Sequence, residues 1–187
     1  MENTTELEKI QEKPEKKNAF LESAFEWASA AMVALLIVSV LFTTVFRLVN
    51  VSGDSMTNTL HNGERLVISN LAYTPEYSDI VILLRTNDTP LIKRVIGLPG
   101  DTIVIDNDKG VVIRNGETLT EPYVKGVTRL SKNAKGMTEA ITVPEGHLYV
   151  LGDNREGSLD SRVLGFQPME NLVGRVLFRL TPFGKVE

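Results

Sequence analysis

Four short polar patches hold the side chains of this chain that could do chemistry. They are residues 52–60 (SGDSMTNTL), 77–81 (YSDIV), 93–101 (KRVIGLPGD) and 152–162 (GDNREGSLDSR). The 187 residues include no cysteine and only two histidines, which excludes thiol nucleophiles and thiolate metal sites and disfavours a histidine-rich zinc centre. The formal net charge of −4 disfavours nucleic acid as the main partner, because neutralising phosphates needs a basic face. The reactive groups left in the patches are hydroxyls, amines and carboxylates.

Each patch taken singly has an ordinary structural interpretation. A Ser-Gly-Asp-Ser run is usually a loop with local side-chain caps. A lysine in an apolar strand usually lies at an edge with its amine in water. A Gly-Asp-Asn-Arg segment is often a turn with a surface ion pair. Only the combination of the patches, and the elements that position them, can indicate more.

The N-terminal part of the chain contains a charged tail and one long apolar segment. Residues 1–26 hold seven Glu and four Lys, and residues 27–46 run for twenty positions without a charge. Twenty helical residues at about 1.5 Å each cross the roughly 30 Å hydrocarbon core of a bilayer, and this segment has no polar face. A cleaved signal peptide fits less well, because the segment is long, starts late and follows no short basic leader. We therefore predict one transmembrane helix over residues 27–46.

The basic residues around this segment predict its orientation in the membrane. Four lysines lie in the tail before it, whereas Arg47 is the only basic residue close behind it. We expect a single-pass protein of the cell membrane, with residues 1–26 in the cytoplasm and residues 47–187 on the outer face.

Beyond residue 46 the sequence changes to short apolar runs separated by turn signals, which is typical of β-strands. Seven segments fit this description: residues 64–73, 78–85, 90–98, 101–106, 110–117, 140–144 and 147–153. Asn115-Gly116 fits a type I′ hairpin turn, because both residues tolerate positive φ, and residues 108–110 fit a second turn. Helical periodicity is limited to short stretches near Leu60 and Met169. We predict a compact, mostly antiparallel β domain over residues 47–187.

In this order and spacing, the four patches resemble the sequence boxes of type I signal peptidases, which are serine proteases of the Ser–Lys kind. The resemblance covers nearly the whole chain, including the apolar segment and the NLVG stretch at residues 171–174. One anchor rather than two is similar to the Gram-positive form of the family. The resemblance implies an all-β domain built from two antiparallel sheets. It also implies a membrane-bound endopeptidase that removes signal peptides from exported preproteins after small residues in an A-x-A pattern.

The resemblance assigns the reaction to two residues. Ser55 matches the family's nucleophile and Lys93 its general base, with an acyl-enzyme as the intermediate. A free lysine titrates near 10.4, so Lys93 must lose roughly three units to be neutral near pH 7. Apolar neighbours such as Ile92 and Val95 are consistent with the burial that would lower its pKa. A Ser–Lys dyad needs no metal or cofactor.

The fourth patch is expected to support this dyad. By resemblance, Ser158 hydrogen-bonds the Lys93 amine and orients it. Asp160 and Arg162 are expected to hold the loop through an ion pair.

Other charged residues near the patches are expected to be structural. Asp153 and Arg155 shape the same turn by resemblance, and Arg94 is placed outside the reaction because adjacent side chains on a strand point in opposite directions. His147 fits a strand edge, and His61 follows the nucleophile segment without matching a motif.

The resemblance gives the oxyanion hole to backbone groups. The Ser55 N–H is the family's donor, and some relatives add a serine hydroxyl two residues earlier. That position is Gly53 here. We therefore expect backbone donors, with Gly53 allowing close approach of the substrate.

The substrate is expected to bind as an extended strand. It would pair with the strand before Ser55 and with residues 91–93 by β-augmentation. The resemblance places six residues around shallow pockets for small side chains: Val49, Val51, Met56, Leu60, Ile82 and Ile92. Ordinary core packing is the competing interpretation, above all for Leu60 and Ile82.

The sequence departs from the family pattern at two positions. Asn58 stands where proline is usual, and the loss of that proline is expected to loosen the turn after the nucleophile. Ser78 stands where glycine is usual, directly before Asp79. Both departures concern loop geometry rather than reacting groups.

Three other interpretations compete with this one. A self-cleaving repressor of the Ser–Lys kind would be soluble and carry a DNA-binding domain, which the apolar segment argues against. A processing peptidase dedicated to one pilin-like or conjugation substrate stays open. A membrane-anchored binding scaffold on a degenerate protease fold is opposed by the presence of Ser55 and Lys93 together with Ser158 and Asp160.

Overall fold

The computed structural model describes residues 15–85, 90–130 and 139–186. The chain divides into two compact units, Met1–Thr44 and Val45–Glu187. The first 14 residues of the charged tail predicted over residues 1–26 lie outside the described residues.

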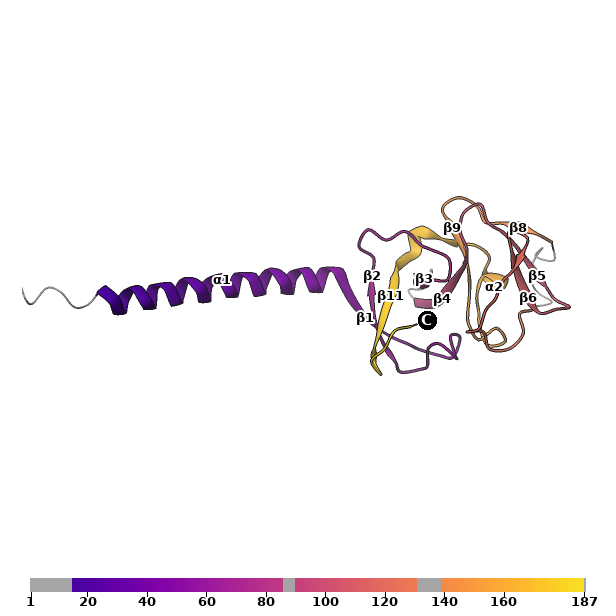
Figure 1. Ribbon diagram of the computed structural model, residues 1–187. Coiled ribbons are helices and arrows are strands. Elements are labelled where there is room, and N and C mark those ends of the chain that lie inside the picture. The colour runs from indigo at the N-terminus through magenta and orange to yellow at the C-terminus, as the bar shows by residue number, and fades with distance from the viewer. Residues whose placement is uncertain (1–14, 86–89, 131–138, 187) are drawn as a thin grey trace, which may run out of the picture. The chain divides into compact units, whose positions relative to one another are not determined.

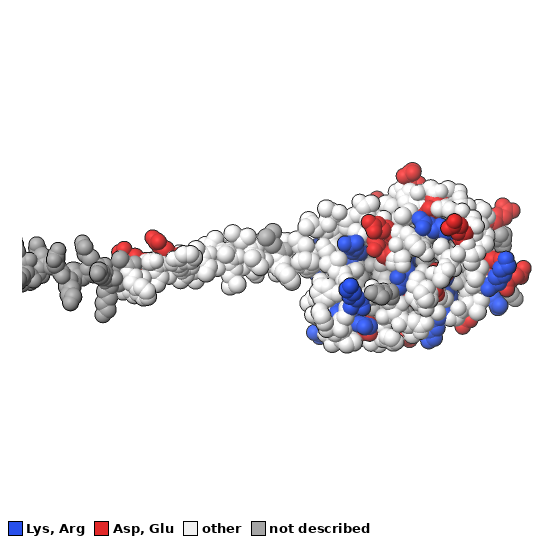
Figure 2. All heavy atoms as spheres, in the orientation of Figure 1, with Lys and Arg blue, Asp and Glu red and all other residues white. Residues whose placement is uncertain are grey.

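The first unit is dominated by one long helix, α1 (Glu15–Val45) (Figure 1). Its sequence contains neither glycine nor proline, so nothing interrupts the backbone hydrogen bonding. Its stretch Phe20–Val45 is long and apolar enough to cross a membrane, and none of it is buried. On the face drawn in Figure 2, charged atoms lie only near the start of the helix. Near its end, the hydroxyls of Thr43 and Thr44 donate to carbonyls one turn earlier, which keeps these polar groups satisfied within the helix.

The second unit contains two antiparallel sheets, as the sequence predicts. The larger sheet has seven strands in the order β1-β2-β11-β3-β4-β9-β10. Their bounds are β1 (Phe46–Asn50), β2 (Arg65–Ser69), β11 (Leu172–Thr181), β3 (Ile80–Leu84), β4 (Pro90–Gly97), β9 (His147–Leu151) and β10 (Gln167–Pro168). The smaller sheet has the order β7-β6-β5-β8. Its strands are β7 (Glu117–Thr118), β6 (Val111–Arg114), β5 (Thr102–Asp106) and β8 (Ile141–Thr142).

Each of the seven predicted strand segments contains a strand of the structure. The predicted hairpin turn is present, with Asn115 and Gly116 at φ of 54° and 84° between the paired residues Arg114 and Glu117. Two short helices complete the unit, α2 (Ser161–Leu164) and the 3₁₀ helix η1 (Met169–Asn171). Thus a short helix forms at Met169, whereas the region of Leu60 forms turns.

The core explains why β3 has an uninterrupted apolar sequence. Ile80 and Ile82 pack into one hydrophobic cluster, and the alternating residues Val81 and Leu83 pack into another on the opposite face. Because successive side chains of a strand point to opposite faces, a strand covered on both sides is apolar throughout. A third cluster, which includes Ile96 of β4 with residues of β5, β6 and β9, joins the two sheets.

Candidate active site

The loop between β1 and β2 holds Ser55 half-buried at the surface of the larger sheet. Its turns are closed by backbone bonds from the N–H of residue 57 to the carbonyl of residue 54 (3.1 Å) and from Leu60 to Met56 (2.8 Å). Met56 and Leu60 are fully buried and anchor the loop to the core. Gly53 has φ of 85°, a conformation that favours glycine, and its N–H donates to Asn62 Oδ1 (3.1 Å).

Lys93 on β4 is the group that faces this serine. Its Nζ donates to Ser55 Oγ at 2.8 Å and to the carbonyl of Ile92 at 2.9 Å. Lys93 is 2% exposed, and burial lowers its pKa to about 8 from an ordinary value of 10.5. The carboxylates of Asp160 and Asp153 act in the opposite direction and raise the pKa. Desolvation is the larger effect, so the amine loses its proton more easily than an exposed lysine.

The loop at residues 152–157 contacts Ser55 and Asp54 from the other side. The Asn154 backbone N–H donates to the carbonyl of Ser55, and its side-chain amide donates to the carbonyl of Asp54, both at 3.0 Å. Gly152 lies where a side chain would collide with Ser158 Oγ and with the Ser55 carbonyl. The loop therefore needs glycine at that point to approach the nucleophile.

Arg94 points away from Lys93 and forms a buried ion pair with Asp153. Its Nε and Nη2 donate to the two carboxylate oxygens at 2.9 and 2.8 Å. Its Nη1 donates to the carbonyl of Ser78 at 3.0 Å, and the Thr59 hydroxyl donates to Asp153. Arg94 therefore joins three segments next to the dyad without contacting Ser55.

Asp160 and Arg162 form a second buried pair, with Nη2 to Oδ2 at 2.8 Å. Asp160 also accepts a hydrogen bond from the Gly152 N–H at 3.0 Å and caps α2 through the backbone N–H of Arg162. The pair thus fixes the far end of the loop on which Asn154 lies.

Ser158 lies in this loop with its Oγ buried against Gly152. Among the described residues, this oxygen has no hydrogen-bond partner. The bond from Ser158 to the Lys93 amine therefore stays a prediction.

A segment at residues 121–128 contacts this loop, and the sequence does not predict these contacts. Glu121 pairs with Arg155, whose Nη1 donates to Oε2 at 3.0 Å, and the ring of Tyr123 lies 3.8 Å from the Arg94 guanidinium. The Lys125 N–H donates to the Asp153 carbonyl (2.8 Å) and its carbonyl accepts from the Arg155 N–H (2.9 Å). Arg155 therefore shares the turn with Asp153, but its carboxylate partner comes from this segment. A Glu-Pro-Tyr sequence is an ordinary turn signal, so nothing in it indicates the role.

The two departures from the family pattern both have left-handed backbone conformations. Asn58 has φ of 93°, which a proline ring cannot adopt, and Ser78 has φ of 74°. Asparagine therefore supplies a positive φ at this position, and the expectation that Asn58 loosens the turn stays a prediction. Ser78 takes a conformation in which glycine has no steric cost.

A small cavity of about 70 Å³ lies beside Ser55 and Lys93. Four of the six residues expected at the substrate pockets line it, namely Val49, Val51, Met56 and Ile92. The other two, Leu60 and Ile82, are fully buried in the hydrophobic cluster behind it. On β4, pairing with β9 starts at Arg94, so residues 90–93 pair with β3 alone. Among the described residues, the other edge of residues 90–93 therefore has no strand partner, and this free edge lies along one wall of the cavity.

The histidines lie outside this arrangement. His61 is exposed, with its Nδ1 3.6 Å from Glu64 Oε1. His147 Nδ1 lies 2.9 Å from the carbonyl of Glu145. In the described ranges, no group of three or more His, Cys, Asp or Glu side chains could hold a metal ion.

Comparisons with known proteins indicate the family of this chain. The family model described as "Signal peptidase, peptidase S26" matches residues 24–181. The chain is 37% identical to a probable signal peptidase I-1 of Synechocystis sp. over 163 residues, which cover 81% of this chain and 79% of the relative. It is 34% identical to signal peptidase I S of Bacillus subtilis over 174 residues, 88% of this chain and 93% of the relative. A crystal structure of a signal peptidase I from Enterococcus faecalis matches at 30% identity with a TM-score of 0.45, covering 55% of this chain and 97% of that chain.

Proposed function

The chain belongs to the peptidase S26 family of signal peptidases, and we propose that it cleaves signal peptides with Ser55 as nucleophile and Lys93 as general base. The observation that carries this proposal is the 2.8 Å contact between Lys93 Nζ and Ser55 Oγ, made where the lysine is almost fully buried. An amine must be neutral to accept a proton, and burial favours its neutral form.

The reaction we propose starts from the neutral amine of Lys93. The lone pair of Nζ takes the proton of Ser55 Oγ as this oxygen attacks the carbonyl carbon of the scissile peptide bond. The protonated amine then gives the proton to the leaving nitrogen, and an acyl-enzyme on Ser55 remains. Water, deprotonated by the same amine, attacks the ester carbonyl, and the protonated amine returns that proton to Ser55 Oγ as the ester bond breaks and the signal peptide leaves. Proton transfer between Ser55 Oγ and Lys93 Nζ depends on the 2.8 Å contact between these two atoms.

The negative charge on the substrate oxygen would be stabilised by backbone donors at the nucleophile loop. The Ser55 N–H is the first of these donors in our proposal. Gly53 supports it indirectly, since its φ of 85° sets the course of the loop just before Ser55. The hydrogen bond from the Asn154 side-chain amide to the Asp54 carbonyl, at 3.0 Å, holds the same peptide unit from behind.

The substrate is proposed to lie as an added strand along the edge of residues 90–93 of β4 that does not pair with β3. The cavity between this edge and residues 49–56 measures about 70 Å³. Such a small cavity favours a small side chain over a large one. This geometry supports cleavage after small residues, as in the A-x-A pattern.

The family and the apolar helix α1 indicate a membrane-anchored protein. We propose that residues 27–46 span the membrane, that residues 1–26 are cytoplasmic and that residues 47–187 form the catalytic domain on the outer face. Secretory preproteins in the bilayer would then present their cleavage sites next to the domain. Protease protection of the full chain in oriented vesicles would test this orientation.

The main experiment is cleavage of a secretory precursor by the purified full chain in detergent, with the cut site determined by mass spectrometry. We expect wild type to cut after the A-x-A segment and both Ser55→Ala and Lys93→Ala to be inert. Lys109→Ala is the matched control, because Lys109 is an exposed lysine far from this site. Circular dichroism verifies that the inert variants are folded.

Two results would contradict the proposal. Activity that survives Ser55→Ala would exclude this serine as the nucleophile. A folded wild type that cuts none of several unrelated precursors would favour the dedicated processing peptidase or the binding scaffold.

A further inference from the structure

A second and larger cavity lies in the same unit, away from Ser55 and Lys93. It measures about 500 Å³ and is formed where the end of β2, the loop that follows it, β11 and the start of β1 meet. None of the residues at the dyad lines it. The proposed peptidase reaction therefore leaves this cavity without a role.

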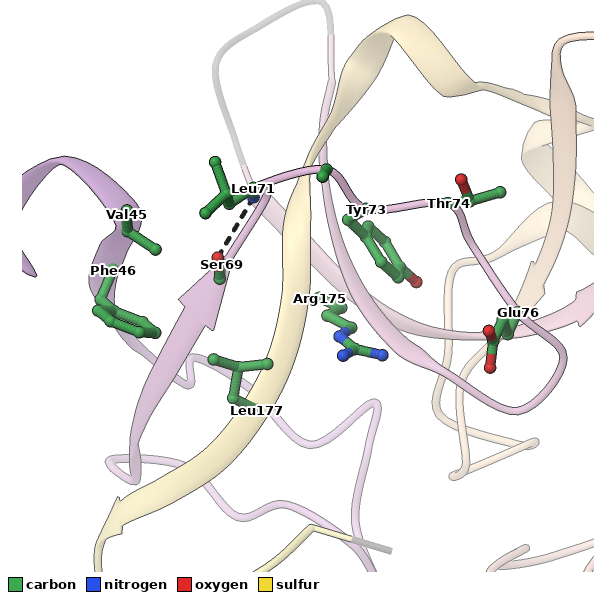
Figure 3. A pocket seen from close by; sticks show the side chains of 10 residues that line it. Val45, Phe46, Ser69, Leu71, Tyr73, Thr74, Glu76, Arg175 and Leu177 are labelled. Atoms are coloured by element: carbon green, nitrogen blue, oxygen red, sulfur yellow. Dashed lines mark hydrogen bonds between the residues drawn. The ribbon is translucent and has the colours of Figure 1, made fainter. Parts of the chain in front are cut away.

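The walls of this cavity differ in polarity from one side to the other (Figure 3). Val45, Phe46, Leu71 and Leu177 form an apolar side. Leu71 is 67% exposed. Tyr73, Thr74 and Glu76 line the opposite, more polar side.

Arg175 points from β11 to the middle of the cavity, between these two sides (Figure 3). Its guanidinium lies 5.3 Å from the centre of the Tyr73 ring. In the described part of the chain, it forms no ion pair with a carboxylate. By contrast, Arg179 on the same strand pairs with Glu64 at 2.8 Å. Arg175 is thus an available cation whose planar fork suits the oxygens of a phosphate.

The position of the cavity along the chain indicates where a phosphate would come from. Val45 is both the last residue of the apolar stretch Phe20–Val45 and part of the cavity wall. If residues 27–46 span a bilayer, as in our proposed function, Val45 lies at the boundary between hydrocarbon and headgroups. Because Val45 is covalently continuous with the apolar stretch, the part of the cavity wall that it forms lies at that depth.

We propose that this cavity binds the headgroup of a phospholipid from the leaflet next to the catalytic domain. The phosphodiester binds the Arg175 guanidinium, and the glycerol end of the lipid lies over the apolar side formed by Phe46, Leu71 and Leu177. Glu76 on the opposite wall disfavours headgroups that carry a second negative charge. The occupied cavity would fix the catalytic domain against the membrane surface, where preproteins emerge.

The experiment uses the absence of native cysteine to place one fluorophore beside the cavity. Asn70→Cys is exposed and next to Leu71 without lining the cavity itself, so a label there leaves it open. The labelled full chain is reconstituted into phosphatidylcholine vesicles that contain phosphatidylcholine with a nitroxide on the headgroup. Quenching of the fluorophore measures headgroup occupancy.

We expect Arg175→Gln to weaken headgroup binding about tenfold, because a charge-assisted contact is lost. Arg175→Lys keeps the charge and retains most of the quenching. Arg65→Gln serves as the matched control, since Arg65 is exposed at the opposite end of β2 from the cavity. Equal quenching in wild type and Arg175→Gln would overturn the proposal, and so would complete displacement of the lipid by inorganic phosphate.

Cleavage of a short soluble peptide in detergent separates this proposal from the proposed function. Arg175→Gln is expected to leave that activity unchanged, because the cavity contains no residue of the dyad. If its KM for the peptide rose in lipid-free detergent, the cavity would bind substrate instead, and the lipid proposal would be wrong. If wild type itself were inert, the peptidase assignment would fail while the quenching result still tested the lipid site.

Discussion

Two cations of the larger sheet, Lys93 on β4 and Arg175 on β11, face cavities of opposite character. Lys93 is 2% exposed, lies beside a cavity of about 70 Å³ and has two carboxylates close enough to influence its pKa. Arg175 is exposed in a cavity of about 500 Å³ and, among the described residues, has no carboxylate at ion-pairing distance. The same fold therefore presents one cation that is stripped of water and one that is left in it.

This difference shows how burial determines the protonation of a basic side chain. An ammonium stripped of water tends to lose its proton and can then act as a base. A guanidinium keeps its charge at every accessible pH and can serve only as a ligand for anions. The residue type and the degree of burial together decide which role is available at each position. Exchange of lysine and arginine at the two positions is consequently the most direct test of this difference.

The largest effect is expected from exchanging lysine and arginine at both positions. Lys93→Arg keeps a cation beside Ser55 but removes the base, so kcat for precursor cleavage should fall roughly 10⁴-fold. Arg175→Lys should leave kcat for a soluble peptide unchanged. Steady-state kinetics in detergent measure both values. Substantial activity in Lys93→Arg would mean that the proton of Ser55 goes elsewhere.

The next largest effect concerns the carboxylate beside Lys93. Asp153→Asn leaves the buried guanidinium of Arg94 without its counter-charge, and we expect this to cost about 3–5 kcal/mol of the free energy of unfolding. Arg175→Gln, at an exposed position with no carboxylate partner, should change it by less than about 0.5 kcal/mol. Urea denaturation of the full chain in detergent measures both. Similar values for the two variants would show that burial does not separate the two arginines.

The pH dependence of Lys93 gives a third test. Its pKa of about 8 predicts that kcat/KM rises about tenfold per pH unit below pH 8 and levels off above it. Arg175→Gln should leave this profile in place. A profile that is flat from roughly two pH units below that pKa to about one unit above it would count against the dyad.

The same pKa makes a prediction about stability. Between about pH 8 and 10.5, Lys93 is protonated in the unfolded chain and neutral in the folded one. The unfolded state then binds more protons, so stability rises with pH across this window, by up to about 3 kcal/mol, and is lower below it. Lys93→Met removes this dependence, and the difference between its unfolding curve and that of wild type isolates it. The inactive variant should be the more stable one near neutral pH.

The sequence predicts the strands more fully than the contacts between them. β3 and β4 have local signals, because apolar runs bounded by turn residues report burial directly. β11 was missed as a strand because its sequence LVGRVLFRLT mixes arginines with apolar residues and its pairing is interrupted by bulges. Because this strand also carries Arg175, the larger cavity could not be predicted from the sequence either.

The candidate site divides in the same way. The spacing and types of residues predict a site at Ser55 and Lys93, since the resemblance depends on local motifs, and the structure brings these two side chains to 2.8 Å. The segment that carries Tyr123 and Glu121 could not be predicted, because its contacts with Arg94 and Arg155 depend on how distant loops pack. The left-handed conformation of Asn58 is also set by the packed loop and has no signal in a single sequence.

The smallest expected effect concerns the backbone beside two arginines of the larger sheet, Arg175 and Arg94. Gly174, next to Arg175, has φ of 156° and lies where a side chain would approach the Ser69 carbonyl to 2.7 Å. Ser78, whose carbonyl binds Arg94, has φ of 74° without being glycine. Such a conformation costs a side chain about 1–2 kcal/mol, and glycine loses about 0.4–1 kcal/mol through the entropy of the unfolded chain.

We therefore expect Ser78→Gly to raise the free energy of unfolding by about 0.5 kcal/mol, because the relief of strain slightly exceeds that entropy. The backbone carbonyl that accepts from Arg94 is kept, so activity should not change. Gly174→Ser is the control of opposite sign, since it adds a side chain to a crowded position that only glycine fits. Thermal unfolding of the three proteins measures both shifts. A loss of stability in Ser78→Gly would mean that the weak hydrogen bond from Arg94 to the Ser78 hydroxyl, at 3.3 Å, outweighs the backbone strain.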